Sequence, residues 1–277
     1  MSILAHSALY ALDLAGLLKL LLISLVAGIG ISAVGPGGVF MTIGLYAFTA
    51  LSPSVVAGTA IVTHVGTGLV GTAAYLRSGH FRRCATRRIA VILCATACLG
   101  IPAGIWINAH VSRQGFGVLL GILTAAIGAL VCYRQWPRRA PGSAPDSTPG
   151  TGAGAARRAL PDVKTALIGL GVAVAASLFG IGGPMLCVPL LVAAGVPMLP
   201  ALAAAQAQSV VGSGFGALGY ALQGAIDWPM AVFIAIPQML GVIVGWKIAH
   251  AVPARGLAFA LAFTLIGLAP YLALGGS

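Results

Sequence analysis

Apolar runs of about twenty residues dominate this chain, and short polar turns separate them. Clear examples extend from Leu14 to Val34, from Ile89 to Ala109 and from Gly115 to Tyr133. A helix needs roughly 20 apolar residues to cross about 30 Å of hydrocarbon, so these runs predict transmembrane helices. Only 7% of the residues are charged, whereas charged residues make up about a quarter of a soluble domain. The sequence therefore predicts an all-α integral membrane protein with about eight transmembrane helices.

Two of the apolar runs end in breaks that are rich in glycine and proline. The first break is Gly35-Pro36-Gly37-Gly38, and the second is Gly180-Ile181-Gly182-Gly183-Pro184. The runs that follow, Val39 to Leu51 and Met185 to Val196, are too short to span a bilayer, so each predicts a half-helix. Glycine and proline release backbone N–H and C=O groups, which inside a bilayer must be buried in protein or face a water-filled cavity. Paired breaks of this kind predict a ligand site near the middle of the membrane.

The two halves of the chain align with each other at one constant offset. An offset of 145 residues takes Gly35 to Gly180 and, without a gap, pairs Ser32 with Ser177, Gly37 with Gly182, Gly38 with Gly183, Gly71 with Gly216 and Tyr75 with Tyr220. This pattern predicts an internal duplication. We expect a first transmembrane repeat over residues 1–134 and a second over 163–277, each with four helices, a break and a half-helix. Residues 135–162, rich in proline, glycine, serine and arginine, have too little apolar surface to fold and predict a flexible linker.

The orientation of the repeats depends on how many times each half crosses the membrane. An even number of crossings gives parallel repeats, with both termini on the cytoplasmic side, and this arrangement is favoured. If the broken segment adds a crossing, the repeats are inverted. The short loops carry few charges, so both arrangements stay open.

The net charge of +11 comes from basic residues that are grouped between apolar runs. One group contains Arg77, Arg82, Arg83, Arg87 and Arg88, and the other contains Arg134, Arg138, Arg139, Arg157, Arg158 and Lys164. Grouping of this kind follows the positive-inside rule, so we assign both groups and the linker to the cytoplasmic side and expect no nucleic-acid partner. The N-terminus has no basic segment before its apolar run, so no cleaved signal peptide is expected.

The four carboxylates limit the choice of substrate. All are aspartates, they lie at segment ends or in the linker, and no glutamate occurs. A cation carrier is expected to hold carboxylates at membrane depth, so an anionic substrate is favoured. The free N–H groups of a half-helix start can bind an anion. We therefore predict that the break glycines bind substrate, namely Gly35, Gly37, Gly38, Gly180, Gly182 and Gly183. The alternative, that these glycines only permit close helix packing, stays open.

Polar side chains on the long helices after the half-helices complete the predicted site. The candidates are Thr59 and Thr63 in the first half and Gln206, Gln208 and Ser209 in the second, with Thr67 and Ser213 on the same helices. They are expected to face the substrate or to bond a neighbouring helix. His64 is the candidate for proton coupling because histidine titrates near physiological pH, and a neutral histidine bonded across helices is the alternative.

No chemistry beyond transport is expected. The five cysteines form neither metal-ligand pairs nor a disulfide framework, and no HExxH motif, carboxylate pair or Ser-His-Asp set falls in the apolar runs. The sequence therefore predicts no enzyme activity, cofactor or metal. It has no Walker A motif, although a separate ATPase subunit stays open, as does a homo-oligomer.

The segments GISAVGPGGVFMTIGLY and SLFGIGGPMLCVPLL, which carry the two breaks, resemble those of the TauE/SafE sulfite exporter-like permeases, also called the toluene sulfonate uptake permeases. The resemblance extends over nearly all of the chain outside the linker. It implies a multi-pass protein of the bacterial inner membrane that exports or takes up sulfite, a sulfonate or sulfoacetate. The two breaks differ, since Pro36 stands opposite Ile181 and Gly44 opposite Pro189. A carrier of a carboxylate or another small solute and a non-transporting scaffold are the alternatives.

Overall fold

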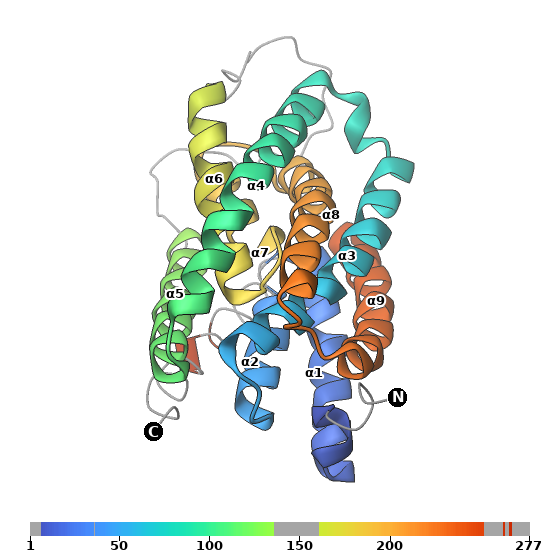
Figure 1. Ribbon diagram of the computed structural model, residues 1–277. Coiled ribbons are helices and arrows are strands. Elements are labelled where there is room, and N and C mark those ends of the chain that lie inside the picture. Colours follow the sequence, from blue (N-terminus) through green and yellow to red (C-terminus); the bar gives the residue numbers. More distant parts are fainter. Residues whose placement is uncertain (1–6, 36, 136–160, 252–262, 264–265, 268–277) are drawn as a thin grey trace.

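The computed structural model describes residues 7–35, 37–135, 161–251, 263, 266 and 267, and these residues form helices without a strand (Figure 1). In chain order the helices are η2 (Ala8–Ala11), α1 (Leu14–Ala33), α2 (Val39–Phe48), α3 (Pro53–Arg77), η3 (His80–Arg82), α4 (Cys84–His110), α5 (Arg113–Gln135), α6 (Asp162–Phe179), α7 (Pro184–Ala193), α8 (Met198–Leu222) and α9 (Trp228–Ala251). The expected linker and the last apolar run of the sequence, Leu257 to Leu274, lie almost entirely outside the described residues.

Six of the described helices are long and apolar enough to cross a membrane, namely α1, α3, α4, α5, α6 and α9. Leu14, Leu18 and Leu22 follow one another at a spacing of four residues on α1, and all three are exposed. Val163 and Leu167 form a similar exposed row on α6. Rows of large apolar side chains on the outside of a bundle face lipid rather than water. These helices are those of a multi-pass membrane protein, as predicted, while the total of eight spans stays a prediction.

Two short helices follow the breaks, where half-helices were expected. Helices α2 and α7 have ten residues each, which at 1.5 Å per residue is about half the thickness of the hydrocarbon core. The local sequence explains the second break. Gly180 takes a left-handed conformation at φ 68°, the Ile181 N–H donates back to the Ala176 carbonyl, and Pro184 occupies the first turn of α7. A left-handed glycine ends a helix, and a proline at the first position starts one.

The same contacts recur in the two halves at the offset of 145 residues. The bounds of α2 and α3 are related to those of α7 and α8 by this offset. The Tyr75 hydroxyl donates to the Ser32 carbonyl at 3.1 Å, and at the related place the Tyr220 hydroxyl donates to the Ser177 carbonyl at 2.8 Å. Both tyrosines are fully buried. The matching positions of the sequence therefore occupy matching positions in space.

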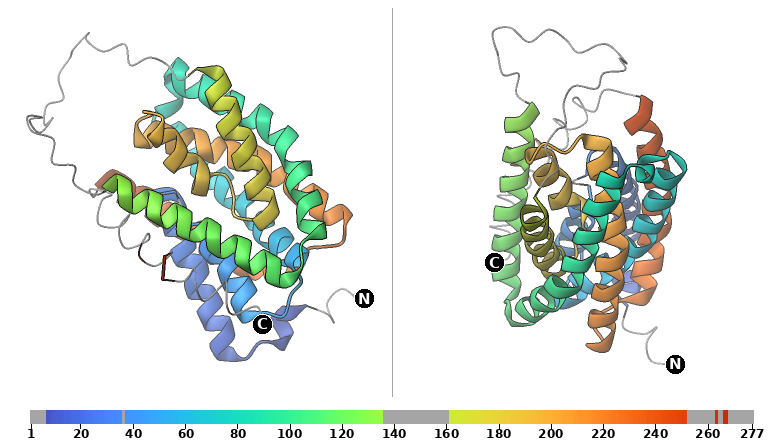
Figure 2. Two further views of the ribbon diagram at one scale, coloured as in Figure 1. Left: turned by 90° about the vertical axis from the view of Figure 1, so that its left-hand side faces the viewer. Right: turned by 90° about the horizontal axis from the view of Figure 1, so that it is seen from above.

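Each half packs its first long helix against the other half, with α1 beside α9 and α6 beside α4 (Figure 1). A Cβ on Gly241 of α9 would collide with the backbone of Leu25 on α1, and one on Gly104 of α4 would collide with the backbone of Val174 on α6. Small residues at a helix contact allow this close approach in membranes. The two halves are thus intertwined, and α5 runs along the outside of the bundle (Figure 2).

The related helices α3 and α8 run antiparallel, so the favoured parallel arrangement is wrong. Gly58, near the start of α3, lies against Ala225, just after the end of α8, whereas Gly71, near the end of α3, lies against Gln206 in the first half of α8. The physical reason is the path of α1 and α2. Helix α1 starts at one end of the bundle and α2 brings the chain back to that end, so α3, α4 and α5, an odd number of long helices, then carry the chain to the opposite end (Figure 1).

Most of the described arginines collect at one end of the bundle, which we call the arginine-rich end, whereas Arg113 at the start of α5 lies at the opposite end, where its guanidinium donates to the carbonyls of Tyr46 and Thr49. The arginine-rich end contains the end of α3 and the starts of α4 and α6, where Arg88 and Asp162 form an exposed ion pair at 2.5 Å. Helix α1 starts at the opposite end, where the Ser7 hydroxyl donates to Asp227, just before α9, at 2.6 Å. The expectation that the N-terminus lies on the same side as the linker is therefore wrong for the described residues.

Candidate functional site

The two breaks meet in the interior of the bundle. Gly35 lies against Pro184 and Val188 of α7, and a Cβ on Gly38 would collide with the Ile181 carbonyl oxygen. The Thr42 hydroxyl of α2 donates to the Gly180 carbonyl at 3.3 Å. Segments that are 145 residues apart in the sequence thus form one structural unit.

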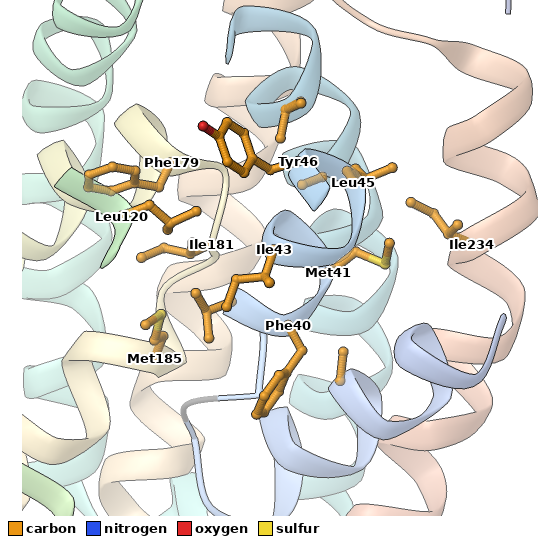
Figure 3. Close-up of a cluster of buried hydrophobic side chains, with 14 of the residues drawn as sticks. Phe40, Met41, Ile43, Leu45, Tyr46, Leu120, Phe179, Ile181, Met185 and Ile234 are labelled. Atoms are coloured by element: carbon orange, nitrogen blue, oxygen red, sulfur yellow. The ribbon is translucent and has the colours of Figure 1, made fainter. Parts of the chain in front are cut away.

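Apolar side chains hold this unit together. Figure 3 shows Ile181 and Met185 of the second break and α7 beside Phe40 and Ile43 of α2. All four side chains are buried. Inside a bilayer, close van der Waals packing of such groups, rather than their removal from water, stabilises the meeting of the breaks.

His64 of α3 lies between the two breaks. A Cβ on Gly38 would be 3.0 Å from His64 Cε1, and a Cβ on Gly182 would be 3.0 Å from His64 Cγ. The imidazole also forms a hydrogen bond with the backbone of Gly180. His64 is only 1% exposed, and its Nε2 has no hydrogen-bond partner within the described residues. The predicted proton-coupling residue thus touches both breaks and keeps one nitrogen available.

Both half-helices start at this meeting point. Helix α2 begins after Gly38 and α7 begins after Gly183. In the part of the chain that the structure describes, the N–H groups of Gly182 and Gly183 donate to no acceptor. The start of a helix carries the equivalent of about half a positive charge. Two converging helix starts with free N–H groups favour a negatively charged ligand.

A small cavity of about 10 Å³, room for about one water molecule, lies beside the second break. It is lined by Gly182, Gly183, Gln208, Ser209, Gly212 and Ser213 and by the apolar side chains of Ile61, Ala97, Ile101 and Ala176. Ser209 and Ser213 lie one helical turn apart, and neither hydroxyl has a hydrogen-bond partner among the described residues. The cavity volume is far below the ~300–1,000 Å³ of pockets for drug-sized ligands, so the cavity is closed in this conformation.

The Gln208 amide is oriented by a neighbouring helix. Its Nε2 donates to the Gly169 carbonyl at 3.4 Å, while its Oε1 has no partner within the described residues. Because a carbonyl can only accept, this bond fixes which atom of the amide faces the cavity. A Cβ on Gly183 would be 3.2 Å from that Oε1. Gln208 therefore offers an acceptor to the cavity, beside the donors of Ser209 and Ser213.

Gln206 lies outside the cavity, in the contact between α8 and α3. A Cβ on Gly71 would be 2.7 Å from the Gln206 side-chain carbon. The side chain is fully buried, and neither its oxygen nor its nitrogen has a partner among the described residues.

The structure does not bring the two predicted threonines to the breaks as free donors. The Thr59 hydroxyl accepts from the Asp227 N–H at 3.0 Å, near the end of the bundle opposite the arginines. The Thr63 hydroxyl donates to the Ala60 carbonyl of its own helix at 2.8 Å. Both hydroxyls are therefore already hydrogen-bonded within the protein, Thr59 to the residue before α9 and Thr63 to its own helix.

Sequence reasoning missed Gln238 of α9. This glutamine is fully buried, and both its amide atoms lack a partner within the described residues. A glutamine in the middle of an apolar run is the signal that would have found it, because such a side chain is costly in lipid and must point inward.

No group of three metal-ligating side chains lies close together within the described residues. The five cysteines are free thiols. The site therefore consists of backbone N–H groups, hydroxyls, amides and one imidazole.

Residues 20–274 match the family model described as "Sulfite exporter TauE/SafE". A curated protein of Sinorhizobium sp., named "Probable membrane transporter protein ORF9", is 33% identical over 93 residues, which are 34% of this chain and 36% of that protein. The alignment thus spans only about a third of that relative. No solved structure matches the chain significantly. The family match confirms the resemblance seen in the break segments: the chain belongs to the TauE/SafE sulfite exporter family.

Proposed function

We propose that this protein is a secondary transporter that moves a small sulfur-containing or organic oxyanion across the bacterial inner membrane. The bound anion accepts hydrogen bonds from the N–H groups of Gly182 and Gly183 and from the hydroxyls of Ser209 and Ser213. One observation carries the proposal: two half-helices start at a single point in the interior, next to a small cavity lined by unpaired donors. The family and the name of the relative support transport as the activity.

The composition of the cavity favours a small anion. No charged side chain lines it, so an anion there is stabilised by N–H and hydroxyl donors and by helix starts rather than by an ion pair. The cavity has about 10 Å³ in this conformation, so it must widen to admit an anion, and sulfite or a short sulfonate needs less movement than a bulky aromatic sulfonate. A carboxylate of similar size uses the same donors and is therefore included in the test.

A proton accompanies the anion in this proposal, and His64 carries it. The imidazole touches both breaks and has a free Nε2. A second charge of opposite sign offsets the large desolvation penalty of an anion at membrane depth. The arginine-rich end, with the linker, faces the cytoplasm according to the positive-inside rule.

The test is transport by purified protein in liposomes. Labelled sulfite, a short sulfonate, sulfoacetate and acetate are supplied outside, with and without an inward proton gradient. We expect uptake of at least one sulfur oxyanion, above that of protein-free liposomes, and faster uptake with the gradient. A panel in which no anion moves contradicts the proposal.

A further inference from the structure

Each residue that lines the cavity has a counterpart 145 positions away in the other half. The polar and break residues correspond to Gly37, Gly38, Thr63, His64, Thr67 and Gly68, and the apolar residues correspond to Gln206, Val242, Trp246 and Ile31. All of these residues are described by the structure.

Two contacts of the cavity residues recur between their counterparts. Gly183 lies against Ser209, and its counterpart Gly38 lies against His64, the counterpart of Ser209. In the same way, Ile61 packs on Gly216 while Gln206 packs on Gly71. The correspondence is therefore one of spatial positions as well as of sequence.

The region formed by these counterparts, which we call the counterpart region, contains buried polar atoms without a hydrogen-bond partner among the described residues. His64 Nε2 and both amide atoms of Gln206 lack partners within the described residues, although the two side chains are at most 1% exposed. An unpaired buried polar group costs about 1–3 kcal/mol. Gln206 stands where the cavity has the apolar Ile61, so this side of the interior is the more polar one.

Because the repeats are inverted, the cavity and the counterpart region extend toward opposite ends of the bundle. The cavity extends from the second break along α8 to Ser213, toward the end at which α8 finishes and away from the arginine-rich end. Its counterpart extends along α3 to Thr67 and Gly68, toward the arginine-rich end where α3 finishes. Ile31, Val242 and Trp246 are larger than Ala176, Ala97 and Ile101, the residues to which they correspond.

We infer that this counterpart is a second binding site for a small oxyanion, formed by His64 and Gln206 and reached from the arginine-rich end. The inference rests on the proposed function and adds to it a second set of ligands. The Gln206 amide nitrogen and, when it carries a proton, His64 Nε2 are the donors for the anion. In an inverted-repeat carrier, movement of one repeat against the other exposes the interior to alternate sides of the membrane, and we expect the two related regions to open in turn with that movement.

A matched pair of cysteines tests the inference. Thr67→Cys and Gly212→Cys are counterparts, and they are placed singly in the full chain after its native cysteines have been replaced by serine. A cysteine is close in size to Thr67, and a Cβ on Gly212 has only ordinary contacts at 3.6 Å. Vesicles of known orientation are treated with a cationic, membrane-impermeant thiol reagent, with and without sulfoacetate.

We expect the reagent to reach Thr67→Cys only from the arginine-rich side and Gly212→Cys only from the other side. With sulfoacetate at about ten times its Kd, both labelling rates should fall by up to about tenfold. When Gln206→Leu is added to each cysteine variant, sulfoacetate should no longer slow the labelling of Thr67→Cys but should still slow the labelling of Gly212→Cys.

The outcomes separate this inference from the proposed function. Labelling of both cysteines from the same side, or protection of Gly212→Cys alone, overturns the second site and leaves the first intact. If sulfoacetate protects neither cysteine, the binding of this anion at both sites is contradicted. Protection at position 67 that survives Gln206→Leu overturns the role of Gln206.

Discussion

The imidazole of His64 lies against Gly182, at 3.0 Å from the place where a Cβ would stand. Gly182 has a φ of 70°, a left-handed conformation that costs an L-residue about 1–2 kcal/mol. Gly182→Ala should therefore destabilise the protein by roughly that amount and displace the imidazole, with anion uptake in liposomes reduced about tenfold or more. Thermal unfolding in detergent and initial uptake rates provide the measurements. Unchanged uptake would show that the contact between His64 and this break has no role in transport.

The two buried tyrosines give a test of the duplicated architecture. Tyr75→Phe and Tyr220→Phe each remove one hydrogen bond to a backbone carbonyl, at Ser32 and Ser177. Each variant should lose about 1 kcal/mol of stability, because a buried carbonyl is left without its donor. Parallel denaturation of the two variants checks this. A loss in one variant without a loss in the other would contradict the equivalence of the two contacts.

Substitution of Ser209 and Ser213 should weaken anion binding without lowering the stability of the protein. Their hydroxyls line the cavity and bind no other described residue. The double variant with Ser209→Ala and Ser213→Ala should raise the KM for anion uptake about tenfold or more, with two donors of roughly 1 kcal/mol each removed. Its unfolding midpoint should stay close to that of the wild type. Ser78→Ala, on the exposed end of α3, is the control and should change neither quantity.

His64→Gln tests proton coupling. Glutamine keeps a hydrogen-bonding side chain next to Gly38 and Gly182 but cannot carry a proton at neutral pH. Uptake driven by an anion gradient should persist, while its stimulation by an inward proton gradient should be lost. Stimulation equal to that of the wild type would assign the coupling to another group.

Asp227 should matter for stability and not for transport. Its carboxylate accepts from the Ser7 hydroxyl at 2.6 Å, from the Ala8 N–H at 2.8 Å and from the Met230 N–H at 3.1 Å, all near one end of the bundle. Asp227→Ala removes a helix cap and should lower stability by about 1–2 kcal/mol. The KM for anion uptake should not change. A raised KM would mean that this end of the protein belongs to the substrate path.

Much of the architecture could be predicted from the sequence, because the bilayer imposes simple rules. The length of the apolar runs predicted an integral membrane protein, and the glycine-rich breaks predicted the short helices α2 and α7. The offset that pairs Tyr75 with Tyr220 predicted a duplication, and the structure adds that both tyrosines donate matching hydrogen bonds. Each predicted feature can be found in the order of residues along one chain, so a single sequence was sufficient.

The orientation of the repeats and the roles of some polar residues could not be predicted. Whether a broken segment crosses the membrane or returns depends on the packing of α2 against the rest of the bundle. Thr59 pairs with Asp227, which is 168 residues away, so its structural role is a tertiary contact without a local signal. Gln206 and Gln208 are two residues apart on α8, yet only Gln208 lines the cavity.

The central claim is that the second break binds the transported anion. Gly183 has an ordinary helical conformation at φ −64°, so alanine there adds only a methyl group, at 3.2 Å from Gln208 Oε1 and at the edge of the cavity. Initial uptake of labelled sulfite into liposomes should therefore fall about tenfold or more in Gly183→Ala, with folding retained. It should stay at the wild-type rate in Gly171→Ala, where a Cβ meets nothing within 4 Å. Equal sulfite uptake by the wild type and both variants would contradict the account.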